Sequence, residues 1–341
     1  MIAPISACLV FFQLSLVYTQ SLGYDAREAT IDSVQHDIFS GLTACRDVTL
    51  SFLARIEALN HYVNAIITLN PNALATAESA DAAFAAGNAT GSLFCIPIFL
   101  KDNYDTADMN TTGGCLDLRN SRPSVDAPSV TALKQAGAII LGKTNLHELA
   151  LEGISVSSLG GQTINPYDLT RTPGGSSGGS AVAVAASFAV FATGSDTVNS
   201  LRSPASANSL FSCRPTRGLI SRKGIIPISY TQDAIGPIAR SVKDVATALT
   251  VMASVGFDPE DNTTALVPSN AVGTDYAGSV TMGSLRGLRL GLIEGFFNRT
   301  KSNETTPVNV VMDNMVVKLQ RAGVVVVPVY ESIYNATAIL A

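Results

Sequence analysis

A run of seven small residues, from Gly174 to Ser180, contains four glycines and three serines and leads directly into the small-residue run Ala181 to Ala186. Ordinary core packing does not require this density of glycine and serine. Glycine lets two backbone segments approach closely and adopt angles that a side chain forbids. Serine is favoured at helix N-termini. The run therefore predicts a tight turn that begins a closely packed helix and holds Ser176 in place.

Two other polar positions follow apolar runs that are typical of buried strands. Lys101 comes directly after the run Ile96 to Leu100, and Ser200 follows a later apolar run and the polar segment Gly194 to Asn199. We expect each strand to place its polar residue at the strand end.

A lysine and two serines together suit nucleophilic chemistry. A hydroxyl is a weak nucleophile and must lose its proton to a base as it attacks a carbonyl. A lysine can be that base only when it is neutral, and burial achieves this by lowering its pKa. A second serine can pass the proton from the nucleophile to the lysine.

The chain resembles the amidase signature family, whose members act on amides through a Ser-cisSer-Lys triad, and within it the secreted fungal-type amidases. The resemblance runs in one order over roughly residues 40 to 330. Its motifs are Lys101-Asp102-Asn103, the stretch Gly142 to Glu148, Asn165-Pro166, Pro173 to Ser180, Pro215 to Gly218, and Asp233 to Ser241. It implies an α/β fold with a mixed, twisted central sheet covered by helices on both faces, and hydrolysis of a carboxylic amide C–N bond.

Carried over position by position, the resemblance implies a role for each residue of the site. Ser200 is the expected nucleophile, Ser176 the relay after a cis peptide bond, and Lys101 the general base. The expected oxyanion hole consists of the backbone amides of Thr197, Val198, Asn199 and Ser200, and the expected substrate-binding residues are Met109, Gly174, Gly175 and Ser177.

One position departs from the family pattern, because most members have two glycines where this chain has Val198 and Asn199. Both residues still carry N–H groups, so the oxyanion hole survives if the turn keeps negative φ angles there. Two alternatives to an amide hydrolase stay open. One is a pseudoenzyme that binds an amide-like ligand without turnover, and the other is an amidotransferase A-like subunit that passes ammonia to a partner.

Other known motifs fit the residues less well. The segment Gly174 to Gly178 satisfies G-x-S-x-G, but an α/β-hydrolase needs its histidine after the serine, and all three histidines, at 36, 61 and 147, precede it. His147-Glu148 lacks the second histidine of H-E-x-x-H, so we expect no metal or cofactor and a scaffold role for His147. We expect Asp196 to accept hydrogen bonds that orient the turn, and Arg202 to anchor it. Tyr104, Met109 and Tyr167 are candidate pocket walls.

Composition limits the classes of partner. The 341 residues can bury an ample core, and a net charge of −5 without basic clusters gives no footprint for nucleic acid. A tRNA-directed transamidase is therefore disfavoured. The expected partners are a small-molecule amide and water, and the oligomeric state is left open.

Several features favour export of the protein. The apolar run Ile5 to Tyr18 is too short for a stable membrane anchor and resembles a signal peptide over residues 1–19. Six N-x-[ST] triplets suit a glycoprotein, at Asn88, Asn110, Asn262, Asn298, Asn303 and Asn335. Cys95 and Cys115 flank the Lys101 segment, and we hypothesise a disulfide bond between them, with Cys45 and Cys213 as buried thiols.

Apolar periodicity predicts alternating helices and strands in one domain over residues 20–341, which we expect to be incomplete at its C-terminal end. Runs of aliphatic residues at 138–141 and 324–327 predict strands buried on both faces. Helices are expected near 44–59, 71–86, 129–136, 179–187, 242–254 and 307–322, and strands near 94–100, 138–142, 188–194, 288–293 and 323–327.

Overall fold

The computed structural model describes residues 23–280 and 283–331, and the predicted signal peptide lies outside the described residues. The chain forms two compact units that meet after Val280, and each is described by itself. The prediction of a single domain over residues 20–341 stays a prediction. Among the described residues, no helix is both long and apolar enough to cross a bilayer.

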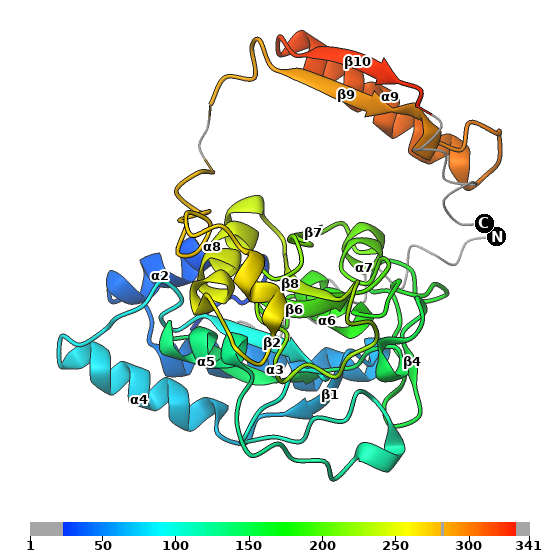
Figure 1. The fold of residues 1–341 in the computed structure, drawn as a ribbon. Helices are drawn as coiled ribbons and strands as arrows, with labels where there is room; N and C mark the ends of the chain where they lie inside the picture. Colours follow the sequence, from blue (N-terminus) through cyan, green and yellow to red (C-terminus); the bar gives the residue numbers. More distant parts are fainter. Residues whose placement is uncertain (1–22, 281–282, 332–341) are drawn as a thin grey trace. The chain divides into compact units, whose positions relative to one another are not determined.

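A six-stranded mixed sheet organises the first unit, with strand order β1-β3-β2-β6-β8-β7 (Figure 1). Strand β2 is parallel to both of its neighbours, β3 and β6, whereas the outer pairs β1–β3, β6–β8 and β8–β7 are antiparallel. The strands are β1 (Ile66–Leu69), β2 (Pro97–Lys101), β3 (Ile139–Thr144), β6 (Phe191–Asp196), β7 (Phe211–Ser212) and β8 (Ala234–Ala239), and a separate pair is formed by β4 (Val156–Ser157) and β5 (Gly161–Gln162).

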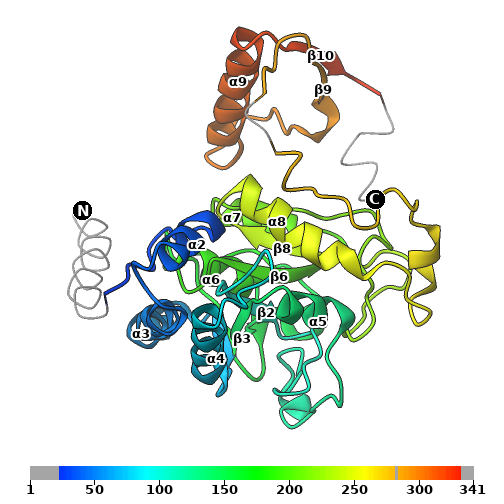
Figure 2. The same cartoon turned by 90° about the vertical axis from the view of Figure 1, so that its left-hand side faces the viewer.

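Helices cover both faces of this sheet, as the resemblance implied. Figure 2 shows α3 and α6 on one side of the strands and α5 on the other. Helix α8 packs against both α5 and β8. The α-helices of this unit are α2 (Ile31–Phe39), α3 (Cys45–Val63), α4 (Ala73–Ala85), α5 (Pro128–Gln135), α6 (Gly178–Ala185), α7 (Arg202–Ala207) and α8 (Val242–Met252). Short 3₁₀ helices are η1 (Leu116–Leu118), η2 (Glu148–Ala150), η3 (Ala253–Val255) and η4 (Asn262–Leu266).

The central strands are buried on both faces because helices lie above and below them. Every residue of β2, β3, β6 and β8 is buried. This confirms the prediction made from the aliphatic run at 138–141. The rigid sheet places the end of β2, with Lys101, beside the end of β6, with Ser195 and Asp196.

The second unit consists of two parallel strands and one helix, namely β9 (Arg289–Ile293), α9 (Thr305–Arg321) and β10 (Val325–Val329), with the short η5 (Glu294–Phe296). The expected strand and helix near 288–293 and 307–322 are therefore present. The run at 324–327 was predicted to be buried on both faces, and this was wrong: Val325 is 55% exposed. A helix packed on a two-stranded sheet leaves the other face of that sheet uncovered in this unit.

The disulfide bond joins Cys45 to Cys95, so the hypothesised Cys95–Cys115 pair was wrong. Cys45 is the first residue of α3, and this helix packs against β2, which begins just after Cys95. The two Cα atoms lie 5.4 Å apart, within the range that a disulfide bond spans. Cys115 and Cys213 are free thiols. The bond therefore ties α3 to the strand that carries Lys101, although not from the side that we expected.

Removing this bond is expected to destabilise the fold. The two cysteines are 50 residues apart in sequence. Loop-closure entropy for that length predicts a loss of about 4 kcal/mol in the free energy of unfolding when both cysteines are replaced by serine. Urea denaturation of the C45S/C95S variant measures it, and C115S is the matched control because Cys115 is unpaired. Equal midpoints for all three proteins would show that the bond does not form in solution.

Candidate active site

Lys101 is the last residue of β2 and is completely buried. Its Nζ atom lies 2.7 Å from Ser176 Oγ and 2.9 Å from Ser195 Oγ. Burial lowers the pKa of Lys101 to about 7, against the smaller opposing effect of the Asp196 and Asp233 carboxylates. The amine can therefore be neutral near neutral pH, which a general base requires.

Ser176 lies in the turn that precedes α6, and the peptide bond between Gly175 and Ser176 is cis. Ser155 holds this turn, because its Oγ donates to Gly174 O at 2.7 Å and accepts the Gly178 N–H at 3.0 Å. A Cβ atom at Gly179 would clash with the backbone oxygen of Asn145. The glycine density of this run therefore has a steric cause, since α6 could not approach that segment with a side chain at this position.

Ser195 was missed from the sequence. Its hydroxyl oxygen accepts hydrogen bonds from Lys101 Nζ at 2.9 Å and from Asn103 Nδ2 at 3.0 Å. It lies one residue before Asp196 on β6, so its side chain points to the opposite face of the strand from that of Asp196. The spacing of Lys101 and Asn103 gave a usable signal, because two residues so close to a strand end can share one partner.

Asp196 orients the turn that carries Ser200, as predicted. Its buried carboxylate accepts the Leu201 N–H at 3.0 Å and binds the guanidinium groups of Arg202 and Arg214, each at 3.2 Å. Arg202 also donates to the backbone oxygen of Val198. The predicted anchoring role of Arg202 is thereby confirmed, and Arg214 is a second anchor that the sequence did not indicate.

Ser200 is 7% exposed and begins the approach to α7. Within the described residues it forms no hydrogen bond with Ser176 or Lys101, so the structure brings together two members of the predicted triad and holds the third on the neighbouring anchored turn. Catalytic hydrogen bonds are often long in a ligand-free enzyme and shorten only in the reacting complex.

The expected oxyanion residues lie on the same turn. Neither Val198 nor Asn199 has a positive φ angle, and this is the condition under which both amides stay usable. Val198 is 64% exposed, so its side chain is directed to solvent and not into the core. Within the described part of the chain, the backbone N–H groups of Val198, Asn199 and Ser200 have no hydrogen-bond acceptor.

The residues predicted to bind substrate or to line a pocket lie in different places. Met109, Gly174, Gly175 and Ser177 are all buried, and Ser177 Oγ donates to the backbone oxygen of Ser195 at 3.2 Å. Tyr104 is fully buried and donates to Gly194 O at 2.6 Å, whereas Tyr167 is 66% exposed. Their substrate-binding role stays a prediction. His147 donates its backbone N–H to Ser176 O at 3.0 Å, in keeping with a scaffold role.

A second buried lysine lies close to the first. Lys143 Nζ, on β3, forms an ion pair with Asp102 Oδ1 at 3.1 Å and also donates to Thr111 Oγ1 at 3.1 Å. Burial lowers the pKa of Lys143, although the Asp102 carboxylate opposes this shift. Because Asp102 directly follows Lys101, this pair holds the backbone at the end of β2.

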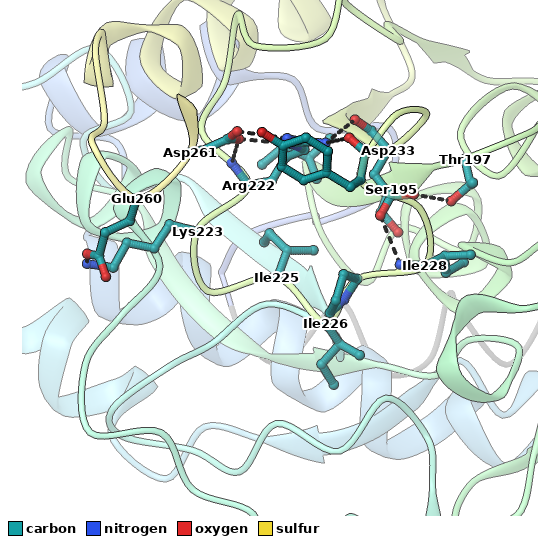
Figure 3. A pocket seen from close by; sticks show the side chains of 13 residues that line it. Ser195, Thr197, Arg222, Lys223, Ile225, Ile226, Ile228, Asp233, Glu260 and Asp261 are labelled. Carbon is teal, nitrogen blue, oxygen red and sulfur yellow. Dashed lines mark hydrogen bonds and ion pairs between the residues drawn. The ribbon is translucent and has the colours of Figure 1, made fainter. Parts of the chain in front are cut away.

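A cavity of about 460 Å³ opens beside Ser195 and Thr197 (Figure 3). Much of its wall is apolar and comes from the segment Ile225 to Ile228, with Ile235 from β8. The cavity thus borders both the hydroxyl that contacts Lys101 and the first residue of the turn that carries Ser200. None of the residues predicted to bind substrate lines it.

Comparison with known proteins now places the chain. The amidase family model matches residues 47–339. The chain belongs to the amidase family. This confirms the family and the fold that the motifs predicted, whereas the finer resemblance to secreted fungal-type amidases stays a prediction.

Three relatives show how far the similarity extends. The chain is 38% identical over 303 residues to the A-type subunit of the glutamyl-tRNA(Gln) amidotransferase from Desulfatibacillum aliphaticivorans, a match that covers 89% of this chain and 60% of that protein. The structure of a peptide amidase from Stenotrophomonas maltophilia matches with a TM-score of 0.82 and 41% identity, over 89% of this chain and 62% of the other. An amidase family protein from Bacillus anthracis matches with a TM-score of 0.81 and 34% identity, over 89% and 60%. The chain therefore spans about three fifths of the length of these amidase family members.

Proposed function

We propose that the protein hydrolyses a carboxylic amide through an acyl-enzyme on Ser200, with Ser176 as relay and Lys101 as general base. The observation that carries this proposal is the 2.7 Å contact between Ser176 Oγ and the buried, pKa-lowered amine of Lys101. A serine that only capped a helix would not need such a partner. Membership of the amidase family supports the same chemistry.

In the proposed reaction, Ser200 Oγ attacks the amide carbonyl as its proton passes to Ser176 and the Ser176 proton passes to neutral Lys101. The carbonyl oxygen takes the negative charge and accepts hydrogen bonds from the free N–H groups of the 198–200 turn. Lys101, now an ammonium, returns the proton through Ser176 to the departing nitrogen, and the C–N bond breaks. Water then attacks the acyl ester by the same route, which regenerates Ser200 and releases the acid.

Release of ammonia from primary amides is the direct test. We expect the purified wild-type chain to release ammonia from at least one simple primary amide, and the Ser200→Ala variant to release none above background. Thermal unfolding of both proteins checks that the variant is folded. Equal rates for the two proteins would remove Ser200 from the mechanism. A folded wild-type chain that binds amides without releasing ammonia would favour a pseudoenzyme.

The pH dependence of the reaction follows from the lowered pKa of Lys101. Below about pH 7 the amine is protonated and cannot accept the Ser176 proton. We therefore expect kcat/KM to fall about tenfold for each pH unit below that value and to level off above it. The measurement is the initial rate from pH 5 to 9 in buffers of constant ionic strength. A rate that is unchanged between pH 5 and 7 would contradict a lysine base.

A role within an amidotransferase complex is the second candidate, and the 38% identity to the A-type subunit of a glutamyl-tRNA(Gln) amidotransferase supports it. In that case the ammonia released at Ser200 would pass to a partner protein and not to water. Both candidates use the same acyl-enzyme. They differ in whether the isolated chain turns over small amides at a steady rate, which the ammonia assay measures.

We further propose that the protein is exported. The buried Cys45–Cys95 disulfide supports an oxidising compartment, because such bonds are rare in reducing ones. Of the predicted glycosylation sites, Asn88, Asn262, Asn298 and Asn303 are exposed, and Asn110 is half-buried with its amide donating to Arg119 O at 2.8 Å. Asn335 lies outside the described residues.

Expression in a secreting eukaryotic host tests export. We expect the chain to reach the medium, and its electrophoretic mobility to increase after treatment with an N-glycosidase. The Asn88→Gln variant should lose one step of that shift, because Asn88 is exposed in a loop after α4. Retention inside the cell with no glycosidase-sensitive shift would contradict export.

A further inference from the structure

We propose that the cavity beside Ser195 binds an uncharged, apolar substituent of the amide substrate. This inference rests on the proposed function and specifies its substrate class. The cavity, about 460 Å³, falls within the range typical of small-molecule sites, and it borders Ser195 and Thr197. Figure 3 shows the isoleucine side chains 225, 226 and 228 on the segment that follows Lys223.

The basic groups on the cavity wall are already paired. Arg222 binds Asp261 through two hydrogen bonds, Nη2 to Oδ1 at 2.7 Å and Nε to Oδ2 at 2.8 Å, and donates a third to Tyr230 O. Lys223 forms an ion pair with Glu260. Neither cation is left to bind a carboxylate of the substrate.

The remaining acidic group is occupied as well. Asp233 accepts the Thr197 hydroxyl at 2.5 Å on one carboxylate oxygen, and the backbone N–H groups of Ile228 and Ser229, each at 2.9 Å, on the other. An ammonium group of a ligand would have to displace these donors. A zwitterionic amide would thus bring two charges to a wall whose own charges are compensated, and burying an unpaired charge is costly.

One polar group is free to recognise a neutral ligand. The Ser195 oxygen accepts from Lys101 Nζ and Asn103 Nδ2, which occupy its two lone pairs. Within the described residues the Ser195 hydroxyl donates to no acceptor, and Ser195 lines the cavity. The site therefore offers one O–H donor beside apolar walls, which suits an uncharged amide with a branched or aromatic substituent.

The test compares primary amides R–CO–NH₂ and N-substituted acetamides with R as methyl, isobutyl or benzyl. We expect kcat/KM in one of the two series to rise about tenfold or more from methyl to the larger groups. We also expect butyramide to be hydrolysed faster than glutamine, whose amide carries an ammonium and a carboxylate on a carbon chain of similar length.

The Ile228→Trp variant narrows the cavity at a side chain that is 38% exposed. It should lower kcat/KM for the benzyl substrate and leave the methyl substrate unchanged. Val242→Trp is the matched control, since Val242 is a half-exposed β-branched residue of α8 that does not line the cavity.

Equal kcat/KM for all R groups in both series, or a preference for glutamine, would overturn this inference and leave amide hydrolysis intact. The wild-type series gives that answer even if Ile228→Trp fails to fold. No hydrolysis of any amide by the folded wild-type chain would overturn the proposed function and this inference together.

Discussion

Replacing Lys101 by methionine should abolish most of the activity, lowering kcat on the order of 10⁴-fold. Methionine keeps the length and the apolar stem but has no amine to accept the Ser176 proton. The loss should appear in kcat more than in KM, because the proton transfer occurs in the transition state. Steady-state amide hydrolysis at pH 8, where the wild-type amine is neutral, measures it.

Lys101→Arg is the informative companion variant. A guanidinium keeps the positive charge and the hydrogen bonds but does not deprotonate near neutral pH, so it should be as inactive as methionine. Lys134→Met is the control, because Lys134 is on α5 and pairs with Asp108 and Asp126. Activity retained in Lys101→Arg would show that Lys101 has an electrostatic or structural role and is not the base.

Replacing Asp102 by asparagine should give the largest loss of stability, about 3–5 kcal/mol in the free energy of unfolding. The reason is that Lys143 would remain buried without its carboxylate partner. Lys143 can lose its proton instead, because burial already lowers its pKa. The unfolded chain then binds one proton more than the folded chain, so stability rises with pH and the loss is larger at pH 5 than at pH 9. Urea denaturation at the two pH values measures both effects.

The double variant D102N/K143M separates the charge effect from lost packing. If the single variant suffers from an unpaired buried cation, removing that cation should restore part of the stability and remove the dependence on pH. A double variant that is less stable than Asp102→Asn, with the same pH dependence, would contradict this explanation. The comparison requires no catalytic activity, so it stands apart from the proposed function.

Much of the fold followed from local pattern. The helices near 44–59 and 242–254 and the strand near 138–142 have clear apolar periodicity and are present. Strand β8 was not predicted because Gly236 and Pro237 interrupt its apolar run, although both lie within the ladder with β6. Helix α7 was missed because Pro204 is inside it, in the first turn, where no backbone N–H is needed for the helix.

The site was predictable where one residue type must occupy one position. Lys101 and Ser176 are such residues, and the structure brings them together. Ser195 and Arg214 were not predictable, because their roles depend on which strands are neighbours, and β8, which carries part of that arrangement, had not been recognised. The disulfide was mispredicted for a related reason. Sequence proximity favoured Cys115, whereas packing of α3 on β2 brings Cys45 to Cys95.

The central claim, that a lysine-activated serine at position 200 forms an acyl-enzyme, is tested most directly by a fluorophosphonate probe. We would label the folded wild-type chain, digest it and identify the modified residue by mass spectrometry, with Lys101→Met treated in parallel. We predict a label on Ser200 in the wild-type chain and none in the variant. A label on Ser176 or Ser195, or equal labelling of both proteins, would contradict the claim.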